Sequence, residues 1–152
     1  MYILEKTTLI DCSQKELFDF HLDTNNIKLI TPKHTNVELI DYEDKTYQGK
    51  IIKLKTVRAF VPISWIVKIE KLQYPSLFVD VALKSPFAFW EHSHIFTQKG
   101  NKCELKDVVK FELPFGIFGK MLAFLVKKDI KNMFDYRHFQ TKKYFDKLKG
   151  KA

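Results

Sequence analysis

The sequence has little cysteine, and what it has is poorly placed for cross-linking. Its 152 residues include only two cysteines, Cys12 and Cys103, which lie far apart and form no C-x-x-C motif. A disulfide scaffold is therefore not expected, and a reduced, cytoplasmic protein is the simpler prediction. The five glycines and five prolines are scattered, so no linker or low-complexity tract divides the chain. We expect one domain that spans residues 1–152.

Long hydrophobic runs are also missing. The most apolar window, residues 113–126, is short and is interrupted by a proline, two glycines and a lysine. A membrane-spanning helix needs about 20 predominantly apolar residues, so this window does not qualify. The N-terminus carries Glu5 and Lys6 and lacks the basic-then-apolar pattern of a signal peptide. These absences predict a soluble protein.

Arginine is scarce in a chain that is otherwise basic. The formal net charge is +8, yet only Arg58 and Arg137 are arginines among 26 basic residues. Proteins that read DNA grooves usually rely on arginine, so no nucleic-acid partner is predicted. Residues 117–152 hold ten basic residues against three acids, which accounts for most of the excess charge. A solvated lysine-rich helix face is the simpler interpretation, and weak contact with an anionic membrane is the alternative.

What the sequence does contain is a succession of strand patterns. Residues 2–11 predict a strand, and the S-x-x-E pair of Ser13 and Glu16 predicts a capping box that begins a short helix. A second short helix is expected over 24–30, ended by Pro32. Apolar and polar residues then alternate in six segments with short links, which predicts an antiparallel meander. The six segments are 36–43, 49–60, 61–72, 76–83, 87–98 and 102–113.

The C-terminal part has a helical period. No proline occurs after Pro114 and no glycine occurs between Gly119 and Gly150, which predicts one helix of about 30 residues. At 100° per residue, one stripe of this helix should contain Leu122, Val126, Ile130, Met133, Arg137, Tyr144 and Leu148. A long helix with such a stripe should lie across the concave face of a curved sheet. The predicted fold class is α+β, a helix-grip fold with about seven strands and two short helices after the first strand.

This layout and several separated motifs resemble one superfamily. The motifs are NNIKLITP at 25–32, PISW at 62–65, FVD at 78–80, SPFAFWEHSHIF at 85–96, LKDVVKFELPFGIFG at 105–119 and MFDYR at 133–137. Together they make the chain similar to the SRPBCC superfamily, which includes START domains, birch-pollen-allergen-like proteins and polyketide cyclase/dehydratase-like proteins. The resemblance extends over nearly the whole chain. Within the superfamily, it is to a subgroup of bacterial proteins. It implies a cavity between helix and sheet for an apolar or amphipathic small molecule, lipid-like or aromatic.

The segment FWEHSHIF places unusual side chains on one face. Because side chains alternate along a strand, Trp90, His92 and His94 share the inward face. On the next strand, Asp107 and Phe111 belong to the apolar face and also point inward. A loop at residues 99–100 would pair His92 with Asp107, whereas a loop at 100–101 would pair His94 with it. Either register brings an inward histidine to an inward carboxylate.

Three more residues complete the candidate site. Arg137 falls within the helix stripe beside Met133, where a charge is costly unless it is paired. It is expected either to pair with Asp107 or Asp80, or to bind a carboxylate or phosphate of a ligand. Trp65 shares an inward face with Ile63 and forms an apolar wall. The expected ligand contacts are Trp65, Trp90, His92, His94, Asp107, Phe111, Met133 and Arg137.

The histidine–aspartate group has several interpretations. It is a buried pair that holds the hairpin in register, or it is the polar end of a ligand pocket. A metal site is a weaker option, since the H-x-H spacing shows only Asp107 as a third ligand, so neither a metal nor another cofactor is predicted.

Three functions follow from these options. The first is a small-molecule binding protein. The second is a cyclase, dehydratase or hydrolase in which His92, His94 and Asp107 act as acid or base, and the third is lipid transfer at a membrane surface.

Overall fold

The structure, a computed structural model, describes residues 1–40, 46–58, 61–114 and 116–150. Its strands are β1 (Tyr2–Ile10), β2 (Asn36–Leu39), β3 (Ile51–Arg58), β4 (Val61–Gln73), β5 (Leu77–Lys84), β6 (Phe89–Lys99) and β7 (Lys102–Glu112). Its helices are α1 (Gln14–Leu22), α2 (Asn26–Leu29) and α3 (Gly116–Leu148). This order confirms the predicted succession of one strand, two short helices, six strands and one long helix. The last residues of the predicted strands 36–43 and 49–60 lie outside the described part of the chain.

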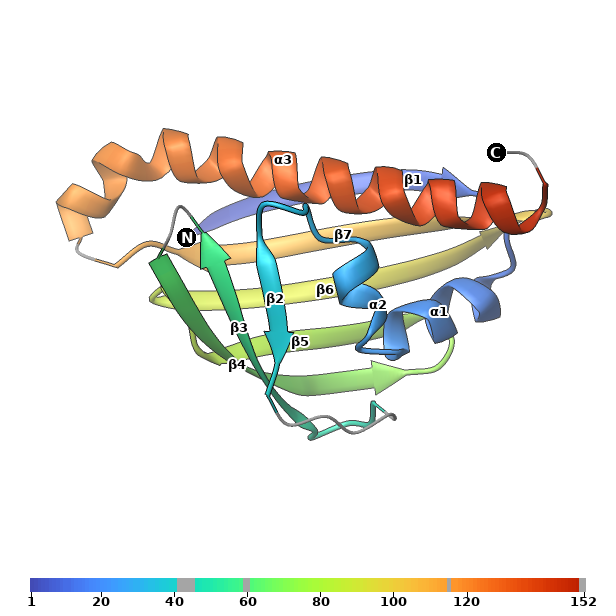
Figure 1. Cartoon of the computed structure of the whole chain (residues 1–152), viewed down its shortest axis with the longest axis horizontal. Coiled ribbons are helices and arrows are strands. Elements are labelled where there is room, and N and C mark those ends of the chain that lie inside the picture. Colours follow the sequence, from blue (N-terminus) through green and yellow to red (C-terminus); the bar gives the residue numbers. More distant parts are fainter. Residues whose placement is uncertain (41–45, 59–60, 115, 151–152) are drawn as a thin grey trace.

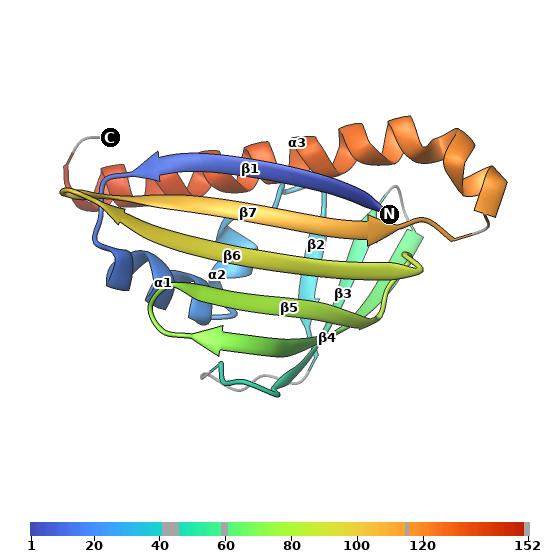
Figure 2. The same cartoon turned by 180° about the vertical axis from the view of Figure 1, so that it is seen from behind.

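The seven strands form one curved antiparallel sheet. Their order is β1-β7-β6-β5-β4-β3-β2, so sequential strands are neighbours except where β1 closes against β7. Figure 1 shows α3 running along the hollow of the sheet, with α1 and α2 at the end near the C-terminus. From behind, Figure 2 shows the outer face of the sheet without a covering helix. The predicted α+β helix-grip arrangement is therefore confirmed.

Local sequence explains where α1 begins and where α2 ends. Ser13 caps α1, because its hydroxyl accepts the backbone N–H of Glu16 at 3.2 Å. In return, the Glu16 carboxylate accepts the backbone N–H of Ser13 at 2.8 Å, which completes the predicted capping box. Helix α2 ends at Leu29, three residues before Pro32, as the proline requires. These two short helices bring residues 20–31 over one end of the concave face.

The β6–β7 hairpin has the second of the two predicted registers. Lys99 pairs with Lys102, so the two-residue loop consists of Gly100 and Asn101. Gly100 has a φ of 60°, a left-handed conformation that glycine adopts without strain. His94 therefore stands directly opposite Asp107, and His92 stands opposite Val109.

The predicted stripe of α3 is wrong in its C-terminal half. Tyr144 and Leu148 are exposed, at 38% and 66% of their surface, and the side chain of Leu122 lies outside the described residues. The buried face instead runs through Ile130, Phe134, His138, Thr141 and Phe145. Apolar periodicity missed this face because His138 and Thr141 occupy two of its positions.

The core consists of two apolar clusters. The α1 core includes Leu17 and Phe18 of α1, Phe96 of β6, Leu105 of β7 and Phe145 of α3. The Trp90 core is formed by Trp90, Val109, Phe111, Ile130 and Phe134. Between the two, the same strands and α3 carry the buried polar residues His92, His94, Asp107, His138 and Thr141. None of the helices in the described part of the chain is long and apolar enough to cross a membrane.

Candidate functional site

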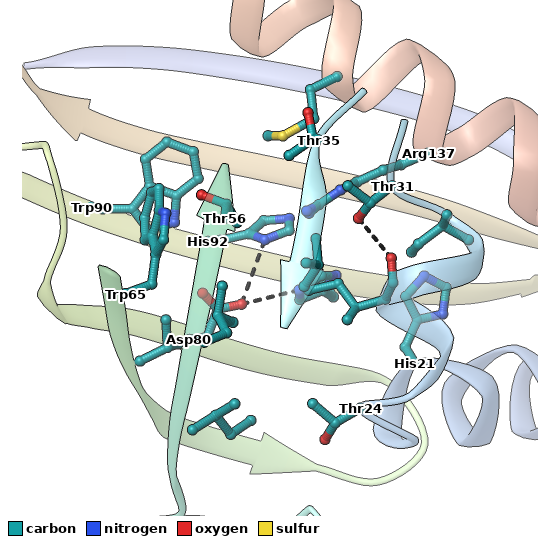
Figure 3. Close-up of a pocket in the computed structure, with 18 of the residues that line it drawn as sticks. His21, Thr24, Thr31, Thr35, Thr56, Trp65, Asp80, Trp90, His92 and Arg137 are labelled. Atoms are coloured by element: carbon teal, nitrogen blue, oxygen red, sulfur yellow. Dashed lines mark hydrogen bonds and ion pairs between the residues drawn. The ribbon is translucent and has the colours of Figure 1, made fainter. Parts of the chain in front are cut away.

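A pocket of about 670 Å³ lies between the concave face of the sheet, the α1–α2 segment and α3. Most of its wall is apolar, and β3 and β4 contribute Ile52, Leu54, Ile63, Val67 and Ile69 to it. Trp65 and Trp90 pack edge to face with ring centroids 5.4 Å apart and form one end of the pocket. In Figure 3 these two rings stand on one side, while Arg137 and His21 stand on the other, with Asp80 and His92 between them.

Two imidazoles in contact, their planes tilted by 46°, form the centre of the polar end. His92 and His94 are successive inward residues of β6, and their ring centroids are 3.7 Å apart. On the pocket side, His94 Nε2 donates to Asp80 Oδ2 at 3.1 Å, and His92 Nδ1 lies 3.5 Å from the same oxygen (Figure 3). Asp80 reaches them because it stands opposite His92 on the neighbouring strand β5.

The other side of the imidazole pair faces a second carboxylate. Asp107 Oδ1 lies 3.3 Å from His92 Nε2 and 3.0 Å from His94 Nδ1. Neither nitrogen makes a well-directed hydrogen bond to this oxygen, so these contacts are electrostatic. Asp107 Oδ2 accepts a hydrogen bond from His138 Nε2 at 2.9 Å, and His138 Nδ1 lies 2.9 Å from the Thr8 hydroxyl. We call Asp80, His92, His94, Asp107 and His138 the polar cluster.

The carboxylates set the charge of the polar cluster. Burial by itself would lower the pKa of His94, but Asp107 and Asp80 outweigh it and raise that pKa to about 9. Burial and the neighbouring His94 lower the pKa of His92, against the opposing effect of the carboxylates. Burial would raise the pKa of Asp107, yet His94 and His92 hold it well below its usual range. The cluster therefore contains a carboxylate and an imidazolium at neutral pH.

Arg137 is a buried cation at the edge of this group. The structure shows no ion pair between Arg137 and either Asp80 or Asp107, so the pairing expected from the sequence is not made. Its Nε is buried and has no hydrogen-bond partner among the described residues. Burial lowers the pKa of Arg137, while Asp107 and Asp80 act in the opposite direction. The guanidinium does line the pocket, and it lies 5.5 Å from the centre of the Phe134 ring.

Comparison with solved structures identifies the fold. A START superfamily protein from Mycobacterium smegmatis superposes with a TM-score of 0.74 at 13% identity, over 96% of this chain and 98% of its own. Ara h 8.0201 superposes with a TM-score of 0.63 at 13% identity, over 92% of this chain and 97% of its own. The chain has the helix-grip fold. A Chromobacterium violaceum protein is similarly close, with a TM-score of 0.74 at 8% identity over 95% of this chain and 96% of its own.

Sequence comparison adds nothing to this assignment. No protein-family model matches the chain, and no curated protein compared with it matches either. The helix-grip assignment agrees with the resemblance to the SRPBCC superfamily. Because the identities are so low, these likenesses establish the fold alone, and the site has to be judged from its own residues.

Within the helix-grip fold, six of the expected site residues line the pocket: Trp65, Trp90, His92, His94, Met133 and Arg137. Two do not line it. Phe111 is fully buried in the Trp90 core, and Asp107 lies behind the imidazole pair. As ligand contacts, all eight remain predictions.

Three residues of the site gave weak or no indication in the sequence. Asp80 shares the inward face of β5 with Phe78, but the sequence suggests it only as a partner of Arg137. His138 was hidden because the predicted helix stripe did not include it. His21 lines the pocket from α1, and its Nδ1 lies 2.8 Å from the Leu17 carbonyl one helical turn earlier, but nothing in the local sequence indicates that its side chain reaches the pocket.

Proposed function

We propose that the protein binds one amphipathic small molecule in the pocket, with its apolar body along β3 and β4 and an acidic head group at Arg137. The observation that carries this proposal is a large, mostly apolar pocket whose polar end holds a buried arginine nitrogen without a hydrogen-bond partner among the described residues. A buried donor without a hydrogen-bond partner is costly, so a bound acceptor would satisfy the Arg137 nitrogen that the described residues leave unpaired.

The dimensions and chemistry of the pocket support a ligand of ordinary metabolite size. Small-molecule sites typically enclose about 300–1,000 Å³ and combine apolar walls with a few polar groups. The pocket, at about 670 Å³, falls within this range. The edge-to-face pair of Trp65 and Trp90 adds flat apolar surface, which suits an aromatic ring or an alkyl chain.

The head group follows from Arg137. Its guanidinium fork can donate two parallel hydrogen bonds to a carboxylate or phosphate, which a lysine cannot do. The imidazole pair, which also lines the pocket, would donate to the same group, whereas the ionised Asp80 is an acceptor and cannot. A carboxylate or phosphate attached to an apolar body is therefore the ligand chemistry that this pocket fits best.

Native mass spectrometry of the gently purified protein is the direct experiment. A bound organic mass that is lost on denaturation supports the proposal and gives the ligand class. If only the mass of the chain is found, a thermal-shift screen of long-chain and aromatic carboxylates is the next experiment. If none of them raises the melting temperature at millimolar concentration, the proposal is wrong, because a ligand that binds only the native state must stabilise it.

A matched ligand pair tests the head group. A carboxylate that binds should lose most of its affinity when it is replaced by its methyl ester, which has the same apolar body without the charge. In Arg137→Met the acid and the ester should bind equally. Lys142→Met is the control, since Lys142 lies on the same helix but pairs with Asp146 at the surface.

A second function, delivery of the ligand at an anionic membrane, is favoured by the start of α3. Met121, Phe124 and Leu125 are exposed at 76%, 74% and 61% of their surface, and Lys127, Lys128 and Lys131 follow within two turns. Figure 1 shows this end of α3 projecting beyond the strands. Exposed apolar side chains next to lysines are typical of helices that insert shallowly into anionic membranes.

Vesicle sedimentation tests this second function. The protein should bind vesicles that contain phosphatidylglycerol and should be released as salt rises, because salt screens the lysines. Phe124→Ser with Leu125→Ser should weaken binding, whereas the control Phe139→Ser, an exposed aromatic further along α3, should not. Indifference to anionic vesicles at low salt would exclude the membrane function and leave ligand binding untouched.

A further inference from the structure

The imidazole pair has a chemical capacity that ligand binding at Arg137 does not use. We propose that Asp80, His92 and His94 bind a divalent first-row transition-metal ion, of the zinc class, at the polar end of the pocket. One oxygen and two nitrogens of these residues lie within 4.8 Å of one another. All three residues line the pocket, so an ion held by them would keep a coordination position open toward it.

The distances suit an ion without a large rearrangement. A metal that holds its ligands at about 2.0–2.1 Å in a tetrahedral arrangement separates the ligand atoms by about 3.3 Å. Asp80 Oδ2 lies 3.1 Å from His94 Nε2 and 3.5 Å from His92 Nδ1, on either side of that value. Two histidines and one carboxylate, with open positions left over, are a known donor set for catalytic zinc and for non-haem iron.

The backbone that carries the three donors is rigid. His92 and His94 are alternate residues of β6, so both point to the same face. Asp80 is the direct cross-strand partner of His92 on β5. Both strands are interior to the sheet, flanked by β4 and β7. A site built on interior strands holds its geometry better than one built on loops.

The residues behind the imidazoles form the support that ligating histidines usually have. Metal-bound imidazoles commonly direct their second nitrogen at a carboxylate, which fixes the tautomer. Asp107 Oδ1 is placed for this role, 3.3 Å from His92 Nε2 and 3.0 Å from His94 Nδ1. His138 donates to the other oxygen of Asp107 and thereby anchors the carboxylate. Asp107 and His138 do not line the pocket, so the two sides of the pair differ in role.

Charge balance agrees with this assignment. In the ion-free protein the charges of Asp80, Asp107, Arg137 and protonated His94 cancel, and His94 releases its proton when it becomes a metal ligand. With both imidazoles neutral, Asp80, Asp107 and Arg137 leave one net negative charge in the buried group. A divalent cation would change this to one net positive charge, which an acidic head group in the pocket would neutralise. The metal site does not depend on such a ligand, and the two proposals can fail separately.

Cobalt(II) is the first probe, because its absorption in the visible range reports the geometry of the bound ion. The untagged full chain is washed with chelator and titrated with Co²⁺, and Zn²⁺ is then added in competition. We expect one equivalent of Co²⁺ to bind, with the absorption of a four- or five-coordinate ion, and Zn²⁺ to displace it. No uptake of Co²⁺ at millimolar concentration, or an octahedral spectrum of aqueous type, would overturn the proposal.

Variants locate the bound ion. Asp80→Ser and His94→Gln should each remove the cobalt spectrum, while circular dichroism shows that the fold persists. His34→Ala, an exposed histidine outside the pocket, is the control and should bind Co²⁺ as the unchanged chain does. If His94→Gln does not fold, Asp80→Ser decides, because Asp80 retains 15% of its side-chain surface and tolerates replacement better. Binding that survives Asp80→Ser would assign the ion elsewhere and overturn the site.

The support residue gives a graded test. Asp107→Asn should weaken metal affinity by about 10- to 100-fold while the stoichiometry stays at one, as removal of an outer-shell carboxylate does in other metal sites. An unchanged affinity would remove Asp107 from the proposed arrangement. If the chelator-washed protein binds organic ligands but no Co²⁺, the metal site is wrong and the proposed function stands. If the chelator-washed protein binds Co²⁺ but no organic ligand, the metal site stands and the proposed function is wrong.

Discussion

The two sides of the His92–His94 pair differ in how they are connected to the rest of the molecule. On one side, Asp107 is buried and is tied through His138 to Thr8 of β1. On the other side, Asp80 faces the pocket and shares one oxygen between both imidazoles. Both sides use a carboxylate, yet among the described residues only Asp107 is connected onward by a chain of hydrogen bonds.

This difference indicates how the fold separates support from function. The Asp107 side links β7, α3 and β1, so it contributes to the stability of the whole molecule. In the described part of the chain, the Asp80 carboxylate contacts the two imidazoles, and it is open to a ligand that enters the pocket. Substitutions on the first side should therefore act on the free energy of unfolding, and substitutions on the second side should act on binding.

The largest effect is expected from Asp107→Ala. It removes the carboxylate that three buried imidazoles contact and leaves a buried charge uncompensated, which typically costs about 3–5 kcal/mol. Urea unfolding at neutral pH measures the loss. Glu104→Ala is the control, since Glu104 lies on the outer face of the same strand and should change stability by less than about 0.5 kcal/mol. A loss for Asp107→Ala no larger than that of the control would contradict the supporting role.

A smaller loss of unfolding free energy is expected when the Thr8 end of the Asp107–His138–Thr8 hydrogen-bond chain is removed. Thr8→Val keeps the shape of the side chain but removes the hydroxyl next to His138 Nδ1. A buried polar group left without its partner costs about 1–3 kcal/mol. Thr7→Val, one residue earlier and exposed on the same strand, should leave the unfolding free energy unchanged. Equal behaviour of the two valine variants would show that the His138–Thr8 contact is not needed.

Asp80→Asn should lower the unfolding free energy less than Asp107→Ala does, and its main effect should be a loss of affinity for Co²⁺. The amide keeps an oxygen beside the imidazoles but loses the charge, so we expect a decrease of about 1 kcal/mol in unfolding free energy. Affinity for Co²⁺ should fall by a far larger factor than stability does. Glu70→Gln, which removes an exposed carboxylate paired with Lys68, is the control for a loss of charge alone. If Asp80→Asn destabilised the protein as strongly as Asp107→Ala, the contrast between the two sides would disappear.

The smallest change in stability, and one of opposite sign, is expected from Arg137→Met. This variant removes a buried charge that has no ion pair with Asp80 or Asp107, and replacement of buried charges by apolar groups is often neutral or stabilising. Thermal unfolding of the ligand-free protein should show an unchanged or raised midpoint. Binding of an acidic ligand should fall in the same variant. A lower midpoint in Arg137→Met would indicate a structural role for the guanidinium instead.

The sequence predicted the fold well because the fold depends on periodic patterns. Strand alternation, the Ser13–Glu16 capping box and the unbroken C-terminal helix are local features, and each has a counterpart in the structure. The site was harder, because it depends on which residues of distant segments meet. His92 and His94 were recognisable as an inward pair, and their approach to Asp107 follows from one hairpin turn.

The residues that were missed have a common cause. His138 lies 31 residues beyond Asp107 and stands on the sheet-facing side of α3, where an apolar pattern would place an aliphatic residue. A stripe based on hydrophobicity alone therefore passes through Tyr144 instead of the buried Phe145. Asp80 was visible on its strand, but its pairing with the imidazoles depends on the β5–β6 register, which the Pro86 segment between the strands does not reveal.

The continuity of α3 links the pocket to the interior. Arg137 and His138 are adjacent residues of one unbroken helix, and the first lines the pocket while the second holds Asp107. A ligand that pushes α3 outward must therefore lengthen the His138–Asp107 bond at the same time. The Nε2 proton of His138 therefore reports whether the pocket is occupied. Its rate of exchange with deuterated solvent should differ between the ligand-free and the ligand-bound protein.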